Sequence, residues 1–159
     1  MAGAATDKAL LGTGLACTLV APGLDLGRDL TLSAGPNGLD LALLDGVDNL
    51  MQCLEIALTT ALGSDVFNST FGFDGINALT QPTSALLARE QVRISVINTV
   101  TGDQRVMSIL DLKLLDGRLD PLGAAGDPTT ARTLAVTVAF QTITGDQAAI
   151  NLGSVTSGG

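Results

Sequence analysis

Few side chains in this sequence could perform acid–base or nucleophilic chemistry. The 159 residues include no histidine, so the chain lacks the usual imidazole base, the usual catalytic triads and the commonest metal ligand. Glu55 and Glu90 are the only glutamates, and two carboxylates across a cleft could hydrolyse a glycosidic bond. We reject this activity because each glutamate lies in a predicted helix with no aromatic or apolar sugar-binding surface around it. We therefore expect no catalytic residue and no enzyme activity.

The two cysteines suggest neither a metal site nor a redox motif. Cys17 and Cys53 are far apart and belong to no Cys-x-x-Cys pair. Without histidine they cannot complete a zinc site. We interpret them as buried or reduced thiols, with a disulfide as the less favoured alternative. We expect no metal and no cofactor.

The charge balance excludes one class of partner. The chain has 16 acidic and 8 basic residues, giving a net charge of −8. Nucleic-acid binding depends on clusters of Lys and Arg, and the sequence has none, so we expect no nucleic-acid partner. Residues 9–20 are apolar but are diluted by glycine, threonine and cysteine, and they are far too short for a membrane span. We expect no secretory signal, no membrane insertion and a cytoplasmic product.

The clearest element lies within residues 39–75. Apolar residues recur there three and four positions apart, which predicts one face of an α-helix. The members of this face are Val47, Leu50, Met51, Leu54, Leu58, Ala61 and Leu62. The opposite face is expected to be solvated and carries Asp48, Asn49, Gln52, Glu55 and Thr59. Asp45 is placed to cap the first turn, and Gly63 to end the helix in the left-handed conformation.

Three of the four phenylalanines follow this helix, in a chain without tryptophan or tyrosine. We expect Phe67 and Phe71 to anchor the loop in the core, with contact to a partner as the alternative. On the helix, we expect Leu50, Leu54 and Leu58 to be core residues.

The N-terminal third carries weaker patterns. Residues 1–14 lack periodicity, and we expect them to be mobile until a partner orders them. Residues 15–24 fit either a short strand or a docking arm. Residues 28–32 and 39–43 alternate apolar and polar side chains around the turn sequence Gly-Pro-Asn-Gly at 35–38, which predicts a β-hairpin.

The C-terminal half has one ambiguous and two clear segments. Ala85, Ala88, Val92, Val96 and Val100 make a helical stripe, but residues 92–96 also alternate as a β-branched strand would, so periodicity leaves both readings open. Two strands are predicted by apolar residues at a period of two. Their inward residues are Leu110, Leu112 and Leu114 in the first, and Leu134, Val136, Val138 and Phe140 in the second.

Two linked motifs resemble the contractile-tail baseplate wedge family, the tail-sheath initiators often described as lysozyme-like. The first is the helix at residues 46–60, which fits GxDNLxQxLxxxLxT and is followed by an FxxxFG loop at 67–72. The second is Asp103-Gln104-Arg105 before a strand, where the family has Glu-Pro-Arg after its second helix. Here the acid is shortened and the proline is lost, while the arginine is kept. The resemblance covers roughly residues 26–143.

The resemblance implies an α+β fold with two main helices packed on a small antiparallel β-sheet, an N-terminal β-hairpin and flexible termini. It favours a helix at residues 84–99. It also implies an N-terminal extension or docking arm at residues 1–25, a wedge and sheath-initiator domain at 26–145, and a flexible tail at 146–159.

The function implied is that of a non-catalytic subunit of a virion or injection-system baseplate, assembled in the host cytoplasm. It would join the wedge to the first tail-sheath ring and initiate the sheath by strand exchange. The implied partners are wedge proteins, the tail-sheath protein, and hub or tube proteins, with copies in a six-fold ring. Asp103, Gln104 and Arg105 would contact the wedge, and the two strands of the C-terminal half would contact the sheath. A tail hydrolase and a free-standing binding domain remain alternatives, and for Arg105 a solvated turn charge is the alternative reading.

Overall fold

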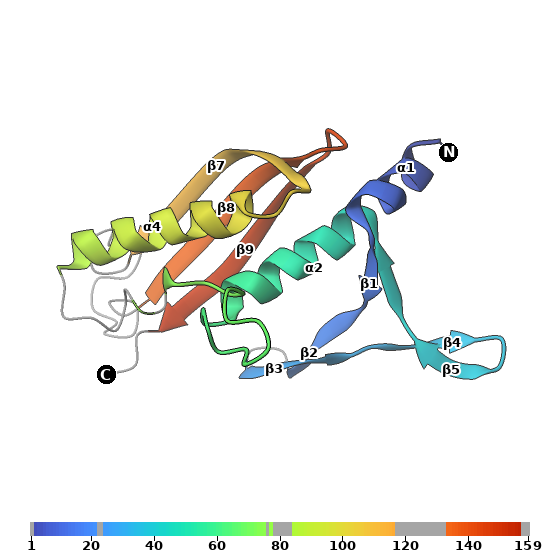
Figure 1. The fold of residues 1–159 in the computed structure, drawn as a ribbon. Coiled ribbons are helices and arrows are strands. Elements are labelled where there is room, and N and C mark those ends of the chain that lie inside the picture. The colour runs from blue at the N-terminus through green and yellow to red at the C-terminus, as the bar shows by residue number, and fades with distance from the viewer. Residues whose placement is uncertain (1, 22–23, 76, 78–83, 117–132, 157–159) are drawn as a thin grey trace, which may run out of the picture. The chain divides into compact units, whose positions relative to one another are not determined.

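The computed structural model describes residues 2–21, 24–75, 77, 84–116 and 133–156. The predicted α+β class is confirmed: the described residues form helices and small antiparallel sheets (Figure 1). The helices are α1 (Ala2–Leu11), α2 (Gly46–Thr59) and α4 (Ala85–Thr101). The chain divides into two compact units, Met1–Cys53 and Leu54–Gly159, and α2 runs across the division.

The first unit contains α1 and three antiparallel ribbons of two strands each. The ribbons are β1 (Thr13–Leu15) with β6 (Leu43–Asp45), β2 (Cys17–Ala21) with β3 (Leu24–Leu30), and β4 (Leu32–Gly35) with β5 (Gly38–Leu41). The predicted hairpin is confirmed at its tip, where Gly35 pairs with Gly38 across a two-residue loop. Its base differs from the prediction, because Arg28 and Leu30 lie in β3 and pair with β2 instead.

The three ribbons meet at a triangle of backbone hydrogen bonds. Ala16 N–H donates to the Ala42 carbonyl, Ala42 N–H to the Thr31 carbonyl, and Thr31 N–H to the Ala16 carbonyl, each at 2.8 Å. Each residue is the single link between two successive ribbons. The chain therefore passes from ribbon to ribbon with these backbone groups satisfied, as buried or half-buried peptide groups require.

Most of the segment 1–14, for which we expected mobility until a partner orders it, has regular structure. Residues 2–11 form α1, whose Leu11 is fully buried. The helix ends at Gly12, which has a positive φ of 84° and donates its N–H to the Lys8 carbonyl at 3.0 Å. The next segment forms strands, as one of its two readings expected, and β1 and β2 pair within the chain.

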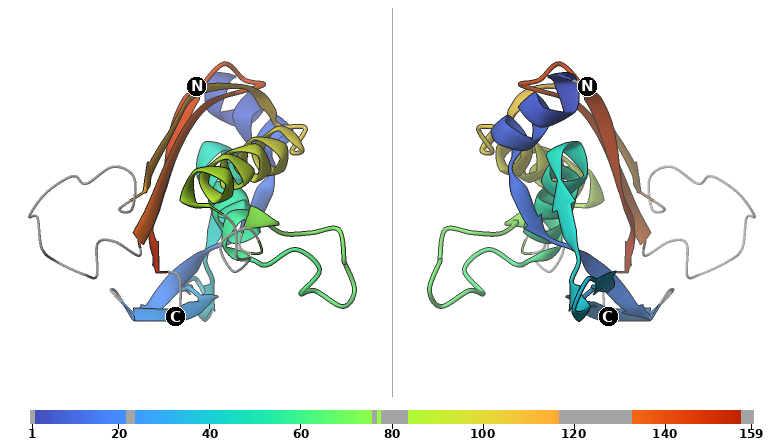
Figure 2. Two further views of the ribbon diagram at one scale, coloured as in Figure 1. Left: turned by 90° about the vertical axis from the view of Figure 1, so that its left-hand side faces the viewer. Right: turned by 90° about the vertical axis from the view of Figure 1, so that its right-hand side faces the viewer.

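The second unit contains a three-stranded antiparallel sheet with the order β7-β8-β9. Its strands are β7 (Val106–Asp116), β8 (Thr133–Thr142) and β9 (Gln147–Thr156). Helix α4 lies along one face of this sheet (Figure 2). The inward residues of β8 are at most 4% exposed, as the alternation predicts; they are Leu134, Val136, Val138 and Phe140.

Strand β9 occupies residues 147–156 of the segment 146–159 that we expected to be a flexible tail, and residues 157–159 lie outside the described residues. The strand pairs with β8 from Gln141↔Gln147 to Thr133↔Thr156. The reversal is made at Gly145, which has a positive φ of 93°. Ile150 is 1% exposed, so this strand contributes to the core.

Helix α4 resolves the ambiguity of the second apolar stripe. The helix begins after Ser84, whose hydroxyl accepts a hydrogen bond from the Leu87 N–H at 3.3 Å, a typical N-cap. The residues at helical spacing are at most 3% exposed, namely Ala88, Val92, Val96 and Val100. The strand reading was therefore wrong.

Helix α2 buries Leu50, Leu54 and Leu58, which are 0%, 2% and 3% exposed. The phenylalanine prediction was wrong for Phe67, which is fully exposed, and Phe71 is only half-buried. Phe67 sits in a tight turn, where its N–H donates to the Asp65 carboxylate at 2.9 Å.

The loop anchor is Phe73, which is 7% exposed. Its backbone pairs with the segment after the helix, because Phe73 N–H donates to the Thr60 carbonyl at 2.8 Å. The two residues expected at the helix ends are also placed. Asp45 forms an ion pair with Lys8 at 3.0 Å, while Gly63 is left-handed with φ 78° but lies in the loop beyond the helix.

Candidate interaction surfaces

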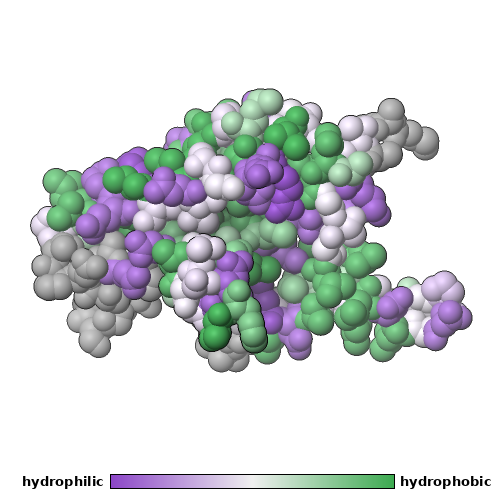
Figure 3. Space-filling model, viewed as in Figure 1, coloured by the Kyte–Doolittle hydropathy of each residue, from purple (hydrophilic) through white to green (hydrophobic). Residues whose placement is uncertain are grey.

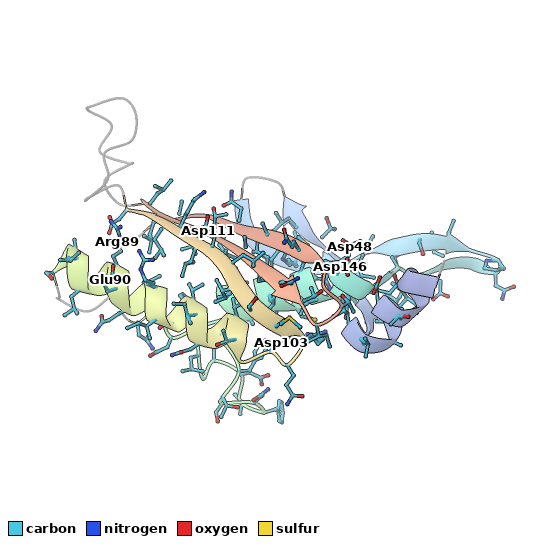
Figure 4. All side chains as sticks on the ribbon, turned by 90° about the horizontal axis from the view of Figure 1, so that it is seen from above. Asp48, Arg89, Glu90, Asp103, Asp111 and Asp146 are labelled. Atoms are coloured by element: carbon cyan, nitrogen blue, oxygen red, sulfur yellow. The ribbon has the colours of Figure 1, made fainter. Side chains whose placement is uncertain are left out.

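The turn between α4 and β7 contains Asp103, which Figure 4 labels, and this residue pairs with Arg105. The guanidinium donates from Nε to Asp103 Oδ1 at 2.9 Å and from an Nη to Oδ2 at 2.7 Å. The Arg105 backbone N–H also donates to Oδ1 at 3.0 Å. The Arg105 carbonyl accepts from Ile143 N–H at 3.0 Å, which fixes the turn against the end of β8. The side-chain pair and the backbone bond to Ile143 therefore both hold the conformation of the turn.

The electrostatics of the turn follow from this pairing. The hydrogen bond from the Arg105 side chain holds the pKa of Asp103 below its usual value, although partial burial opposes the shift. The two side chains are 26% and 21% exposed. Arg105 therefore has a defined structural partner in its own chain, which a solvated turn charge would lack. Gln104, between them, is exposed.

The sheet corrects the assignment of the strand that another chain could join. β8 lies between β7 and β9, so both of its edges are already paired. Its inward side chains belong to the core, and this excludes them as contact residues while the sheet is intact. Within this sheet, β7 and β9 each have one edge that no described strand occupies.

The predicted residues of β7 fall into different environments. Leu114 is 4% exposed, Leu112 is half-buried and Leu110 is 48% exposed. Leu110 lies outside the regular pairing with β8, because β7 has one extra residue between Ile109 and Asp111. Such a bulge bends an edge strand and interrupts its regular ladder.

Two polar residues of the helical motif have a role that the sequence did not reveal. Asn49 and Gln52 were expected on a solvated face, but they are 4% and 8% exposed. Gln52 Nε2 donates to the Leu15 carbonyl at 2.7 Å, and its Oε1 accepts from Cys17 N–H at 2.7 Å. Asn49 Nδ2 donates to the Leu11 carbonyl at 3.1 Å. These amides satisfy backbone groups of the N-terminal segments.

Gly14 supports the same arrangement. A β-carbon at this position would collide with Asn49 Oδ1. The glycine therefore allows β1 to lie close to the helix. The signals in the sequence were the pairing of amide side chains at i and i+3 in the helix and the glycines at positions 12 and 14.

Within the described ranges, no group of three or more Cys, Asp or Glu side chains is placed to hold a metal ion. Nor does any helix in those ranges have the length and apolar character needed to cross a membrane. Glu90 forms an ion pair with Arg93 at 3.2 Å on the surface of α4. The chain matches no protein-family model, and no curated protein matches it.

Proposed function

We propose that this protein is a structural subunit of a contractile-tail baseplate that joins the wedge to the first tail-sheath ring. The observation that carries the proposal is the sheet of the second unit, which ends at β7 and β9 with unoccupied edges among the described residues. Open edges accept a strand from another chain, and the backbone bonds supply the affinity. The resemblance of α2, its following loop and the Asp103–Arg105 turn to the baseplate wedge family supplies the identity of the partner.

Strand exchange would use β7 or β9. Strand β8 would act as the fixed centre of the sheet, because it is paired on both sides. The side chains on the inner face hold the sheet to α4, so register with a sheath strand would depend on the outer face and on the backbone.

The edge of β9 offers a matched test in Ala148 and Ala149, which pair with Phe140 and Ala139 of β8. Successive amides of a strand point to opposite edges, so only one of these two N–H groups faces β8. Proline removes the donor. One of Ala148→Pro and Ala149→Pro should therefore weaken the sheet, and the other should leave its ladder intact. Urea unfolding identifies the variant that keeps wild-type stability. With that variant, co-expressed tail proteins should form baseplates that lack a sheath in electron micrographs.

Leu112→Pro and Lys113→Pro test the edge of β7 in the same way. Baseplates that carry complete sheaths with the stable variant of both pairs would refute strand exchange. The wedge contact is tested separately by Gln104→Ala, because Gln104 is exposed and its loss spares the Asp103–Arg105 pair. Gln104→Ala should reduce incorporation into the wedge while sheath-strand pairing is unaffected. Cell-wall hydrolysis by the purified chain would instead favour the lysozyme-type alternative.

A further inference from the structure

The ribbons of the first unit carry an unusual set of exposed leucines. Seven leucines on β1–β6 are each 40–76% exposed. We call them the leucine face: Leu15, Leu19, Leu30, Leu32, Leu39, Leu41 and Leu43. In Figure 3, apolar atoms gather where the ribbons meet.

The pairing register places these leucines on one side of the ribbons. Residues directly opposite in an antiparallel pair share a face, as do residues two apart along a strand. The pairs next to the triangle are Leu15↔Leu43, Cys17↔Leu30 and Leu32↔Leu41. Each triangle residue separates two of them along the chain, so alternation carries the same face around all three ribbons. Leu19 and Leu39 extend it by one step, from Cys17 and Leu41.

The opposite side of the ribbons β2–β3 and β4–β5 carries polar pairs. Thr18 pairs with Asp29, and Ser33 pairs with Asp40, and all four residues are exposed. These two ribbons therefore have one mainly polar side, which also holds the exposed Val20, and one apolar side that is exposed as well. Isolated exposed leucines need no explanation, but a contiguous apolar patch indicates a binding surface.

The size of the leucine face fits a stable protein interface. Its leucines expose on the order of 600 Å² in total, against about 800 Å² per partner in a standard specific interface. The polar margin of the ribbons would supply the remainder. The leucine face and its margin together therefore approach the area of a standard specific interface.

The charges indicate which chain would occupy it. Among the ribbon residues whose side chains the structure describes, the charged members of the leucine face are Arg28, opposite Leu19, and Asp45, which is opposite Thr13 and pairs with Lys8. The acidic Asp29 and Asp40 alternate onto the other side. The leucine face therefore offers no acidic field to attract a basic partner, and two copies meeting through it would keep Asp29 and Asp40 apart.

We propose that the leucine face is a homodimer interface, in which two copies of this chain bury their leucines against each other. A two-fold axis that lies in the plane of the interface, midway between the ribbons β2–β3 and β1–β6, would place Arg28 of each copy near the Lys8–Asp45 ion pair of the other. The inference goes beyond the proposed function and does not depend on it.

The test measures self-association of the full chain by sedimentation velocity across the micromolar range. The wild type should form a reversible dimer. Leu32→Lys should weaken the dimer at least about tenfold, because it places a charge in an apolar contact. Ser33→Lys is the matched control: it adds the same charge at the next residue, which is exposed on the polar side, and should dimerise like the wild type. Leu39→Lys, at a site 76% exposed, repeats the test if Leu32→Lys does not fold.

The reactivity of the Cys17 thiol measures independently whether the leucine face is covered, because Cys17 lies opposite Leu30 beside the triangle. In a Cys53→Ser background, its alkylation rate should fall as the protein associates and should recover in Leu32→Lys. A wild type that stays monomeric across the range would overturn the proposal. So would a dimer that is unaffected by Leu32→Lys or Leu39→Lys, or one in which Cys17 reacts at the monomer rate. A monomer with a protected Cys17 would show that another part of the chain covers the face, and this too would overturn the proposal.

Discussion

The strands of the two units follow the same alternation and end with opposite exposures. The apolar residues of β8 are at most 4% exposed, whereas the leucine face is 40–76% exposed. Helix α4 covers the sheet of the second unit, while the ribbons diverge from a hydrogen-bonded triangle. Alternation in a sequence therefore predicts which side chains share a face, but the element that covers the face decides whether it becomes core.

The largest expected effect comes from placing the same charge in each region. Val138→Asp puts a carboxylate at a site with 0% exposure and should cost about 4 kcal/mol or more of unfolding free energy, enough to abolish the fold. Leu39→Asp, at 76% exposure, should change stability by about 0.5 kcal/mol or less at protein concentrations where the chain is monomeric. Urea denaturation measures both. Comparable losses would mean that the leucine face is buried in the isolated chain.

A second pair of substitutions compares two phenylalanines of the loop that follows α2. Phe73→Ala should cost about 3 kcal/mol, because the ring is 7% exposed and its removal leaves a cavity. Phe67→Ala should be nearly neutral, since that ring is fully exposed. Thermal unfolding followed by circular dichroism distinguishes them. A large effect at Phe67 would contradict its placement outside the core.

A third pair of substitutions tests the buried polar contacts of the first unit at Gln52, which is 8% exposed. Gln52→Leu leaves the Leu15 carbonyl and the Cys17 N–H without their partner and should cost about 2 kcal/mol. Asp48→Asn, on the exposed side of the same helix, should cost about 0.5 kcal/mol through the helix dipole. Chemical denaturation provides the values. Equal effects would indicate that water replaces the amide without penalty.

The smallest effect concerns the Asp103–Arg105 turn and depends on pH. Arg105 lowers the pKa of Asp103, so the folded chain binds fewer protons than the unfolded chain as pH falls. The stability that this pKa shift contributes is fully present at pH values above the unfolded pKa of about 3.9. It is lost as the pH falls through the lower pKa of Asp103 in the folded chain. Arg105→Gln should therefore cost about 1 kcal/mol at neutral pH, and the difference from wild type should shrink below about pH 4.

Lys113→Gln is the control for the turn, because Lys113 pairs with Asp111 at 3.2 Å but both side chains are more than half exposed. Its effect should be undetectable by the same pH series of urea titrations. If the difference caused by Arg105→Gln stayed constant down to acid pH, the carboxylate would not be responsible for it.

The elements predicted from the sequence were those with strong apolar periodicity. Helix α2 and strand β8 each carry large apolar side chains at a regular spacing, whereas periodicity left α4 ambiguous and only the resemblance favoured a helix there. Strand β9 was missed because two of its first three residues are small; only the spacing of Ile150 and Leu152 after Gly145 marked it. Helix α1 was missed because its early residues are mostly alanine and glycine, and Gly12 was the only stop signal.

The candidate surfaces were predictable only in part. The motif located Asp103 and Arg105, but nothing in the spacing required the arginine to fold back onto its own aspartate. Asn49 and Gln52 were placed in solvent because polar residues on a helix usually lie there. Their backbone partners lie far away in the sequence, and a single sequence does not reveal such pairings. The leucine alternation was visible, although its exposure was not.

The triangle of Ala16, Thr31 and Ala42 has a consequence for local opening of the fold. Each amide donates to the carbonyl of the next corner, so separating any one ribbon from the junction breaks two of the three bonds. The corners should therefore open as one cooperative unit instead of fraying singly. Hydrogen–deuterium exchange would register this as a single shared protection factor for the three amides, and a Thr31→Pro substitution, which removes one donor, should accelerate exchange at the other two corners together.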